Sequence, residues 1–227
     1  MSVSIVLVDD HAILREGLRL LLERQGDMEI VGEASDGRQA LEVVARVHPD
    51  VVLMDVTMPN LNGIGATADI LRVQPGIHVL ALSAHADRRF VKEMLSAGAR
   101  GYLLKDTAGD NLIEAIHTVM AGNVYLSPKV AGLVVEGFTD LWGDDAGPGP
   151  GGTQAQHGGF ASLTVREKEL LQLLAEGKSN KQAAAVLRLS VKTVDARRRS
   201  IMDKLGVSSM AEMTKIAIRE GLTSVDF

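Results

Sequence analysis

Five polar side chains that could together carry out phosphoryl chemistry each follow a short apolar run of the sequence. They are Asp9, Asp10, Asp55, Ser83 and Lys105. Carboxylates held close together repel one another and favour a cation among them. Oxygen ligands of this kind suit a hard divalent ion such as Mg²⁺. A carboxylate beside such an ion can attack a phosphoryl group and become an aspartyl phosphate. The residue types therefore predict a Mg²⁺-dependent phosphoacceptor site.

The elements that must position these side chains alternate regularly along the first half of the chain. Apolar runs predict strands at residues 3–8, 28–34, 51–54, 77–82 and 101–104. Helical patterns lie between and after them, at residues 11–25, 38–47, 63–73, 87–97 and 109–121. This alternation is typical of a doubly wound α/β domain with a five-stranded parallel sheet. The carboxyl ends of parallel strands share one edge, so we expect the polar residues to converge there.

The position of each carboxylate predicts its role. Asp55 ends the middle strand of the expected sheet and is our predicted nucleophile. Asp9 and Asp10 are the predicted metal carboxylates, with Asp55 itself as a further ligand, and the backbone carbonyl of Thr57 could complete the coordination.

The other polar groups at this edge divide into two kinds. The Lys105 ammonium and the Ser83 hydroxyl are expected to balance the charge of the phosphoryl group. His11 and His85 also border the site but lack companions at metal-ligand spacing, so we interpret both as surface groups.

The motifs around these residues resemble the receiver domain of two-component response regulators. The resemblance covers about residues 1–122 and rests on Asp9-Asp10, Asp55 with Met58-Pro59-Asn60 and Gly63, Ser83-Ala84, and Gly101-Tyr102-Leu103-Leu104-Lys105. It implies a flavodoxin-like fold and phosphorylation of Asp55 by a sensor histidine kinase. It also implies a switch in which Ser83 moves toward the phosphate and Tyr102 turns inward. Many receivers have proline after the lysine, whereas Asp106 stands here and is expected to begin a turn.

Composition restricts the class of protein. The 227 residues are 46% hydrophobic, contain no cysteine and carry a net charge of −5. Residues 1–159 hold 12 basic and 21 acidic side chains, whereas residues 160–227 hold 12 and 8. This asymmetry predicts two modules with different partners. No apolar run approaches a membrane span and no basic leader precedes the first strand, so we expect a cytoplasmic protein with no membrane association.

A segment at residues 123–159 is the predicted linker between the modules. It contains a predicted helix at 128–138 and a predicted tether at 143–159, where seven of 17 residues are glycine and two are proline. Such a composition cannot build a core and behaves as a flexible chain.

The back module, residues 160–227, has the pattern of four short helices. Thr164 and Glu167 form a predicted capping box, Ser179 caps a helix that ends at Leu187, and the last helix spans 208–219. The third helix, 191–205, is rich in basic residues and is the predicted DNA-reading helix of a helix-turn-helix. The predicted DNA contacts are Lys181, Lys192, Thr193, Asp195, Ala196, Arg197, Arg198 and Arg199.

This module resembles the LuxR-type output domain of the NarL/FixJ class of regulators. The resemblance rests on Leu163-Thr164, Arg166-Glu167, Gly177-Lys178-Ser179-Asn180-Lys181 and Ser190-Val191-Lys192-Thr193-Val194. Arg197, Ala183 and Arg188 depart from the family pattern, the last standing where a turn glycine is usual. In the family the last helix often pairs two output domains, so 208–219 is the predicted dimer helix.

The combined hypothesis is a transcription factor that is switched by phosphorylation of Asp55 and binds double-stranded DNA as a homodimer. It accepts a phosphoryl group and is not an enzyme, with slow self-dephosphorylation as its only turnover. Two alternatives stay open from the sequence: a constitutive DNA-binding protein whose front module only binds partners, and a phosphohydrolase that uses the same carboxylates.

Overall fold

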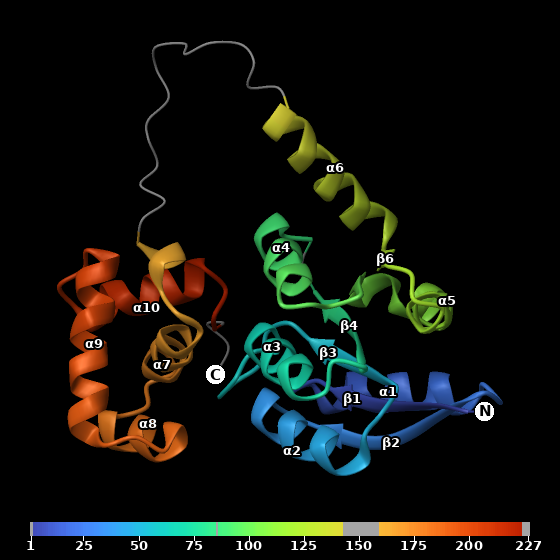
Figure 1. Cartoon of the computed structure of the whole chain (residues 1–227), viewed down its shortest axis with the longest axis horizontal. Helices are drawn as coiled ribbons and strands as arrows, with labels where there is room; N and C mark the ends of the chain where they lie inside the picture. Colours follow the sequence, from blue (N-terminus) through green and yellow to red (C-terminus); the bar gives the residue numbers. More distant parts are fainter. Residues whose placement is uncertain (1, 85, 143–158, 224–227) are drawn as a thin grey trace. The chain divides into compact units, whose positions relative to one another are not determined.

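The computed structural model describes residues 2–84, 86–142 and 159–223, and the chain divides into two compact units at residues 1–147 and 148–227 (Figure 1). His85 and residues 143–158 of the predicted tether lie outside the described residues. The domain boundaries predicted after residues 122 and 159 stay predictions.

The first unit is built on a parallel sheet of six strands in the order β2-β1-β3-β4-β5-β6. The strands are β1 (Val3–Val8), β2 (Met28–Ala34), β3 (Val51–Asp55), β4 (His78–Ser83), β5 (Gly101–Leu104) and β6 (Tyr125–Leu126). Every residue of β3 is buried, as expected for a central strand that is covered on both faces. The doubly wound parallel architecture predicted from the sequence is confirmed.

Helices cover both faces of this sheet. They are α1 (Ala12–Glu23), α2 (Gly37–Val47), α3 (Gly63–Val73), α4 (Arg88–Ser96), α5 (Ala108–Met120) and α6 (Pro128–Trp142). Successive side chains of β1 point to opposite faces and so enter two different cores. Ile5 and Leu7 pack with α1 and α5, whereas Val6 and Val8 pack with α2, α3 and α4.

The predicted count of five strands was one too low, because β6 was not predicted. Tyr125 and Leu126 pair in parallel with Gly101 and Tyr102 of β5. A strand of two residues carries too little alternation to be read from sequence, and it forms because the edge of β5 offers unpaired backbone groups.

The linker helix is longer than predicted and is part of the first unit. We expected residues 128–138, and α6 extends to Trp142. Val130 is fully buried in the core that also contains Phe90 and Met94 of α4, and Val134 packs against that core. Packing against α4 therefore stabilises this helix beyond its local sequence preference.

In its described residues, 159–223, the second unit has four α-helices around one core, as predicted. They are α7 (Val165–Ala175), α8 (Asn180–Leu187), α9 (Val191–Leu205) and α10 (Met210–Arg219), preceded by the 3₁₀ turn η2 (Phe160–Ser162). The predicted capping box of Thr164 and Glu167 is present. The last helix begins two residues later than predicted, because Ser209 caps it together with Glu212.

The turn between α8 and α9 contains a backbone conformation that L-residues seldom adopt. Arg188 ends α8 with φ 54° and ψ 45°, in the left-handed region. A side chain with a Cβ atom is strained there by about 1–2 kcal/mol relative to the right-handed helix. Arg188, where the family pattern usually has glycine, therefore carries backbone strain. The packing of α8 against α9 offsets this cost in stability.

Candidate functional site

The carboxyl edge of the sheet brings the predicted receiver residues together. Lys105 begins the 3₁₀ turn η1 (Lys105–Thr107), and its Nζ lies 2.7 Å from Oδ2 of Asp55 and 2.8 Å from Oδ2 of Asp9. Both carboxylates are almost fully buried. Because they come from β1 and β3, which are neighbouring strands, the sheet register itself sets their proximity. Asp106 lies exposed within η1, in agreement with the predicted turn.

An acidic cluster at this edge has the composition of a divalent-cation site. Ligand atoms of Asp9, Asp10, His11 and Asp55 all lie within 4.8 Å of one another. Three of these groups are carboxylates, the hard oxygen donors that Mg²⁺ prefers. The residues present therefore fit a bound Mg²⁺, with Asp9, Asp10 and Asp55 as the residues that would hold it.

The electrostatics of the cluster also favour an additional cation. Burial and the neighbouring Asp9 carboxylate raise the pKa of Asp55 to about 7, although Lys105 acts in the opposite direction. Burial lowers the pKa of Lys105, but the Asp55 and Asp9 carboxylates outweigh burial and raise that pKa overall. One ammonium thus does not fully compensate the buried carboxylates, and a divalent ion would make the ionised form of Asp55 more favourable.

The two predicted switch residues contact each other. Ser83, at the end of β4, hydrogen-bonds the Tyr102 side chain. Tyr102 is fully buried in β5, and this burial raises the pKa of its hydroxyl to about 12. The inward position of Tyr102, predicted as one state of the switch, is the position that this structure has.

The loop after Asp55 passes close to its carboxylate. The backbone N–H of Thr57 donates to Oδ1 of Asp55 at 3.4 Å. A Cβ atom at Gly63 would overlap the backbone carbonyl oxygen of Asp55, so only glycine fits there. The loop therefore closes tightly over the strand end, and the Thr57 carbonyl as a metal ligand stays a prediction.

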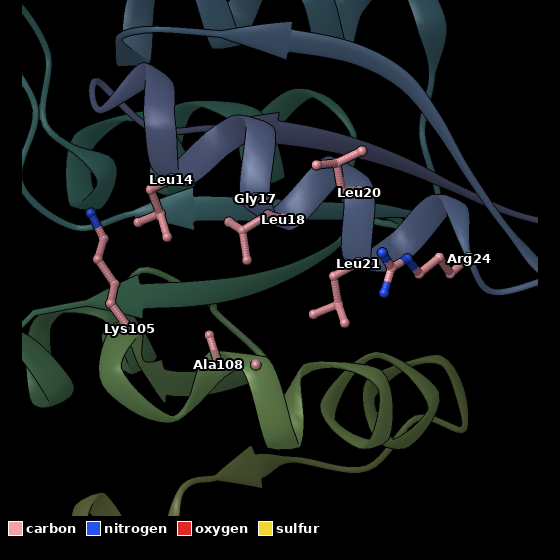
Figure 2. A pocket seen from close by; sticks show the side chains of 9 residues that line it. Leu14, Gly17, Leu18, Leu20, Leu21, Arg24, Lys105 and Ala108 are labelled. Atoms are coloured by element: carbon pink, nitrogen blue, oxygen red, sulfur yellow. The ribbon is translucent and has the colours of Figure 1, made fainter.

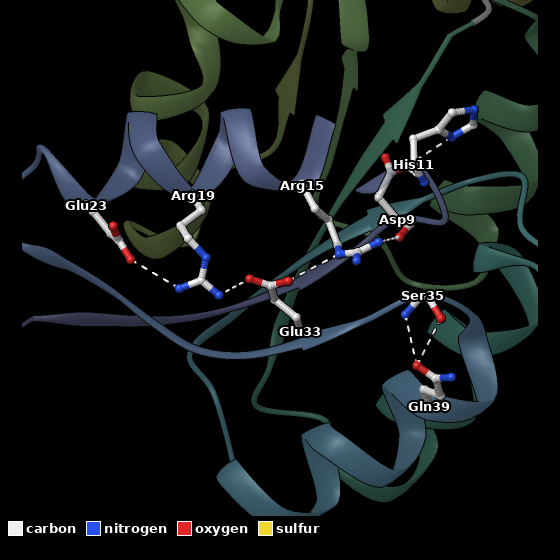
Figure 3. A network of polar contacts seen from close by, with 8 residues as sticks. All are labelled: Asp9, His11, Arg15, Arg19, Glu23, Glu33, Ser35 and Gln39. Carbon is white, nitrogen blue, oxygen red and sulfur yellow. Dashed lines mark hydrogen bonds and ion pairs between the residues drawn. The ribbon is translucent and has the colours of Figure 1, made fainter. Parts of the chain in front are cut away.

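Two residues at this edge were not assigned a role from the sequence. His11 was interpreted as a surface group, but its Nδ1 lies 2.6 Å from Oδ1 of Asp10, and its backbone N–H donates to Oδ1 of Asp9 at 2.8 Å. Arg15 donates through Nη1 to the backbone carbonyl of Asp9 at 2.6 Å (Figure 3). The sequence signal for His11 was its place directly after Asp9-Asp10, whereas nothing in the spacing pointed to Arg15.

A groove of about 390 Å³ lies beside the site, between α1 and α5 (Figure 2). Leucines dominate its lining, which consists of Leu14, Gly17, Leu18, Leu20, Leu21, Arg24, Lys105, Ala108 and Gly109. Leu20 and the nearby Ile13 are exposed by 52% and 90%. The groove therefore joins an apolar helix surface to the lysine that contacts Asp55.

In the second unit, α9 presents an exposed stripe that contains three of the predicted DNA contacts. Lys192, Ala196 and Arg199 are exposed, and their spacing of four and three residues places them on one side of the helix. Val194 and Ile201, on the opposite side, are fully buried in the core. Lys181, at the start of α8, is also exposed.

The other predicted DNA contacts are less accessible. The Asp195 carboxylate accepts a hydrogen bond from the Asn180 amide of α8, and the Thr193 and Ser190 hydroxyls lie 2.8 Å apart. Arg197 and Arg198 are partly buried. The structure thus groups Lys192, Ala196 and Arg199 and directs the Asp195 side chain toward α8.

An ion pair anchors α9 to the start of α7. Lys204 Nζ lies 2.7 Å from Oε2 of Glu167, the residue that also completes the capping box with Thr164. These contacts oppose the cost of burying Glu167 and lower its pKa to about 2. The orientation of the basic helix therefore depends on a carboxylate far from the exposed stripe.

Among residues 2–84, 86–142 and 159–223, no helix combines the length and the apolar character that crossing a bilayer requires.

Comparisons with known proteins agree with both units. Residues 5–117 match the response regulator receiver domain, and residues 161–217 match the bacterial regulatory proteins of the luxR family. The transcriptional regulatory protein DegU of Brevibacillus brevis is 35% identical over 233 residues, which cover 99% of this chain and 96% of DegU. The oxygen regulatory protein NreC of Staphylococcus carnosus is 37% identical over 220 residues, covering 96% and 98%.

A solved structure is similar as well. The two-component response regulator of the LuxR family from an Aurantimonas species superposes with a TM-score of 0.59 at 35% identity, over 61% of this chain and 99% of that one. The acidic edge, the exposed basic stripe and these full-length similarities agree. The chain therefore belongs to the two-component response regulators that carry a LuxR-type DNA-binding domain, a family of transcription regulators.

Proposed function

We propose that this regulator is switched by Mg²⁺-dependent phosphorylation of Asp55 by a sensor histidine kinase. The observation that carries the proposal is the position of Lys105, whose ammonium contacts both Asp55 and Asp9. That arrangement holds the Asp55 carboxylate beside the Lys105 ammonium, while the side chain of Asp10 stays partly exposed to solvent.

The chemistry follows from the groups at the edge. An Asp55 carboxylate oxygen attacks the phosphorus of a phosphohistidine, the P–N bond breaks, and the imidazole departs with the bond electrons and takes a proton. The Lys105 ammonium stabilises the charge on the transferred group, and the Ser83 hydroxyl can donate to it. A bound Mg²⁺ supplies charge neutralisation at the same place. Asp9, Asp10 and Asp55 are the residues proposed to hold this ion, with the Thr57 carbonyl.

We propose that the kinase contacts the groove between α1 and α5. An apolar helix surface with exposed Ile13 and Leu20 is suited to pack against a helix of a partner. Lys105 lines the same groove and contacts Asp55, so a partner seated there lies close to the acceptor. This location gives the kinase a surface for recognition in addition to the acidic residues.

The switch is proposed to act through the contact between Ser83 and Tyr102. A phosphoryl group on Asp55 offers Ser83 a charged acceptor, which competes with its present hydrogen bond. Tyr102 lies in the core that contains α4 and Val130 of α6. A movement of Tyr102 would therefore change the packing of α6. Phosphorylation therefore shifts the equilibrium between two packing arrangements of this core.

DNA binding is proposed to use α9 in the major groove, with two chains reading two half-sites. The exposed stripe of Lys192, Ala196 and Arg199 supports direct contact with the bases, with Lys181 and the flanking residues Thr193, Arg197 and Arg198 on phosphates. Because the Asp195 carboxylate bonds Asn180, we propose that it orients α9. The dimer is proposed to form through α10, where Ile216 and Ile218 stay partly exposed.

The two alternative functions predict different properties. A phosphohydrolase needs a substrate pocket with a base beside the nucleophile, whereas four of the nine residues that line the groove near Asp55 are leucines and its two ionisable residues, Arg24 and Lys105, are cationic. A constitutive DNA-binding protein would gain nothing from a buried lysine held between two acidic residues. We therefore propose a regulator that is not an enzyme and that acts in the cytoplasm, where its kinase partner and DNA are present.

The deciding experiment measures intact mass and oligomeric state with and without acetyl phosphate and Mg²⁺, on wild type and on Asp55→Ala. A phosphoryl adduct that needs Asp55 and produces dimers is the expected result. An adduct without dimers would contradict the dimer switch and favour release of the output domain within one chain. No adduct on wild type would refute the phosphorylation mechanism.

A further inference from the structure

An ion-pair network extends from α1 and β2 to the backbone of the acidic edge (Figure 3). The Glu33 carboxylate of β2 pairs with Nε of Arg15 at 3.2 Å and also with the guanidinium of Arg19. Arg19 pairs in turn with Glu23, one helical turn later, at 3.1 Å. Of these two arginines, only Arg15 also contacts the acidic edge, by donating a hydrogen bond to the backbone carbonyl of Asp9.

Four polar contacts fix the backbone and the side chain of Asp9. Its N–H donates to the carbonyl of Ala34 at 3.2 Å, and its carbonyl accepts from Arg15 at 2.6 Å. One carboxylate oxygen accepts the N–H of His11, and the other lies beside Lys105. Of these contacts, the one from Arg15 acts on the peptide that joins Asp9 to Asp10, the two carboxylates that would hold a cation.

The charge of this arginine needs compensation, because a guanidinium near a divalent-cation site would repel the ion. Glu33 supplies that compensation directly, since its carboxylate contacts the guanidinium of Arg15 on the side away from Asp9. Arg15 and Glu33 are exposed by only 18% and 27%, so solvent screens their pairing incompletely. The pair therefore provides a rigid donor to the Asp9 carbonyl with little net charge.

We propose that Arg15 is a positioning residue for the divalent-cation site. It orients the peptide between Asp9 and Asp10 so that both carboxylates face the same point, and Glu33 holds its guanidinium in place. Groups that orient metal ligands typically contribute 10- to 100-fold in metal affinity. The inference rests on the proposed cation site, and it assigns part of that site's affinity to a residue that does not touch the ion.

The test uses direct Mn²⁺ binding to the full chain, followed by the loss of the free-ion signal in electron paramagnetic resonance. Mn²⁺ takes the same oxygen ligands as Mg²⁺ and requires no phosphorylation for its detection. Three variants are compared with wild type: Arg15→Met, which keeps the stem without the donors; Arg15→Lys, which restores a cationic donor; and Arg19→Met. The last is a matched control, because Arg19 leaves the same helix and pairs with the same Glu33 without contacting Asp9.

We expect Arg15→Met to weaken Mn²⁺ binding about 10-fold, and Arg15→Lys to recover at least part of that loss. Arg19→Met should stay within about twofold of wild type, since it changes only the outer part of the network. Circular dichroism and thermal melting establish that each variant is folded before binding is compared.

The possible failures are distinguishable. If wild type itself binds no Mn²⁺, the proposed cation site is wrong. If wild type binds Mn²⁺ and Arg15→Met binds it equally well, the positioning role of Arg15 is wrong. An equal loss in Arg19→Met would also overturn the inference, because the effect would then belong to the stability of α1.

Discussion

Lys105 and Asp55 form an ion pair with Nζ 2.7 Å from Oδ2, across the end of the intervening strand β4. The pair lies at the buried end of the sheet, where each charge is costly unless it is compensated. The pKa of Asp55 is nevertheless raised to about 7, mainly by burial. Ionised Asp55 therefore lowers the free energy of unfolding, and a cation bound beside it would reduce that loss.

The first prediction concerns that cost. Because the pKa of Asp55 is about 7 in the folded state against 3.8 ordinarily, the stability of the fold falls as pH rises from about 4 to about 7, and above pH 7 this group causes no further loss. We expect Asp55→Asn to raise the melting temperature at pH 8 in the absence of metal, and to do so much less at pH 5. Mg²⁺ at ten times its Kd should stabilise wild type by about 1.4 kcal/mol and the variant by less. Equal stabilisation of both by Mg²⁺ would contradict the role of Asp55 as a ligand.

The second prediction concerns Tyr102 and Ser83. Tyr102→Phe removes the hydroxyl that bonds Ser83 inside the core, which we expect to cost about 1 kcal/mol in urea unfolding. The half-buried Tyr125 of β6 provides a control, and Tyr125→Phe should change stability by less than about 0.5 kcal/mol. In the proposed switch, Tyr102→Phe still accepts the phosphoryl group but dimerises less. Loss of the phosphoryl adduct in a folded Tyr102→Phe protein would place Tyr102 in the transfer step instead.

The third prediction uses the lowered pKa of Glu167. Its pKa is about 2 in the folded protein against 4.5 ordinarily, so its ionised form stabilises the fold above pH 4.5, and that stability is lost as pH falls toward 2. Glu167→Gln keeps a capping side chain but loses the charge that pairs with Lys204. We expect calorimetry to show the output-domain transition destabilised by about 1 kcal/mol at pH 7. The difference from wild type should shrink as pH falls from 4.5 to 2, and a constant difference would show that the ion pair contributes nothing.

The fourth prediction concerns the left-handed residue of the turn between α8 and α9. Glycine adopts the conformation of Arg188 without steric strain, so Arg188→Gly should stabilise the output domain by about 1 kcal/mol. Gly206 ends α9 with φ 67°, and Gly206→Ala should destabilise by a similar amount. Chemical denaturation measures both changes. If Arg188→Gly proved destabilising, the arginine side chain would be contributing contacts that exceed its backbone strain.

The fifth prediction separates DNA-contacting charge from other surface charge. Each of Arg197→Ala and Arg198→Ala, at residues of α9 that are proposed to contact phosphates, should weaken binding to a duplex and reduce the slope of log K against log salt by about 1. Lys215 is exposed on α10, and Lys215→Ala is expected to leave the slope unchanged because this helix is proposed to face a second chain. Titrations at several salt concentrations give the slopes directly. A reduced slope for Lys215→Ala alone would place α10, rather than α9, on the DNA.

Local patterns were sufficient for most of the fold. Alternating apolar runs located β1 to β5 with their helices, and the side chains of Thr164 and Ser179 marked the starts of α7 and α8. These features depend on neighbouring residues along the chain, so they are readable without a structure. β6 and the full length of α6 were not, because they exist through contact with β5 and α4.

The chemistry of the site divides in the same way. The sequence by itself determined which residues end the strands, and the parallel direction of those strands then placed Asp9, Asp55 and Lys105 at the same edge of the sheet. Only the tertiary structure decided that Arg15 contacts the Asp9 carbonyl and that Asp195 turns toward Asn180. The physical reason is that strand ends are fixed by backbone pairing, whereas a long or charged side chain selects its partner from the surfaces that packing brings within reach.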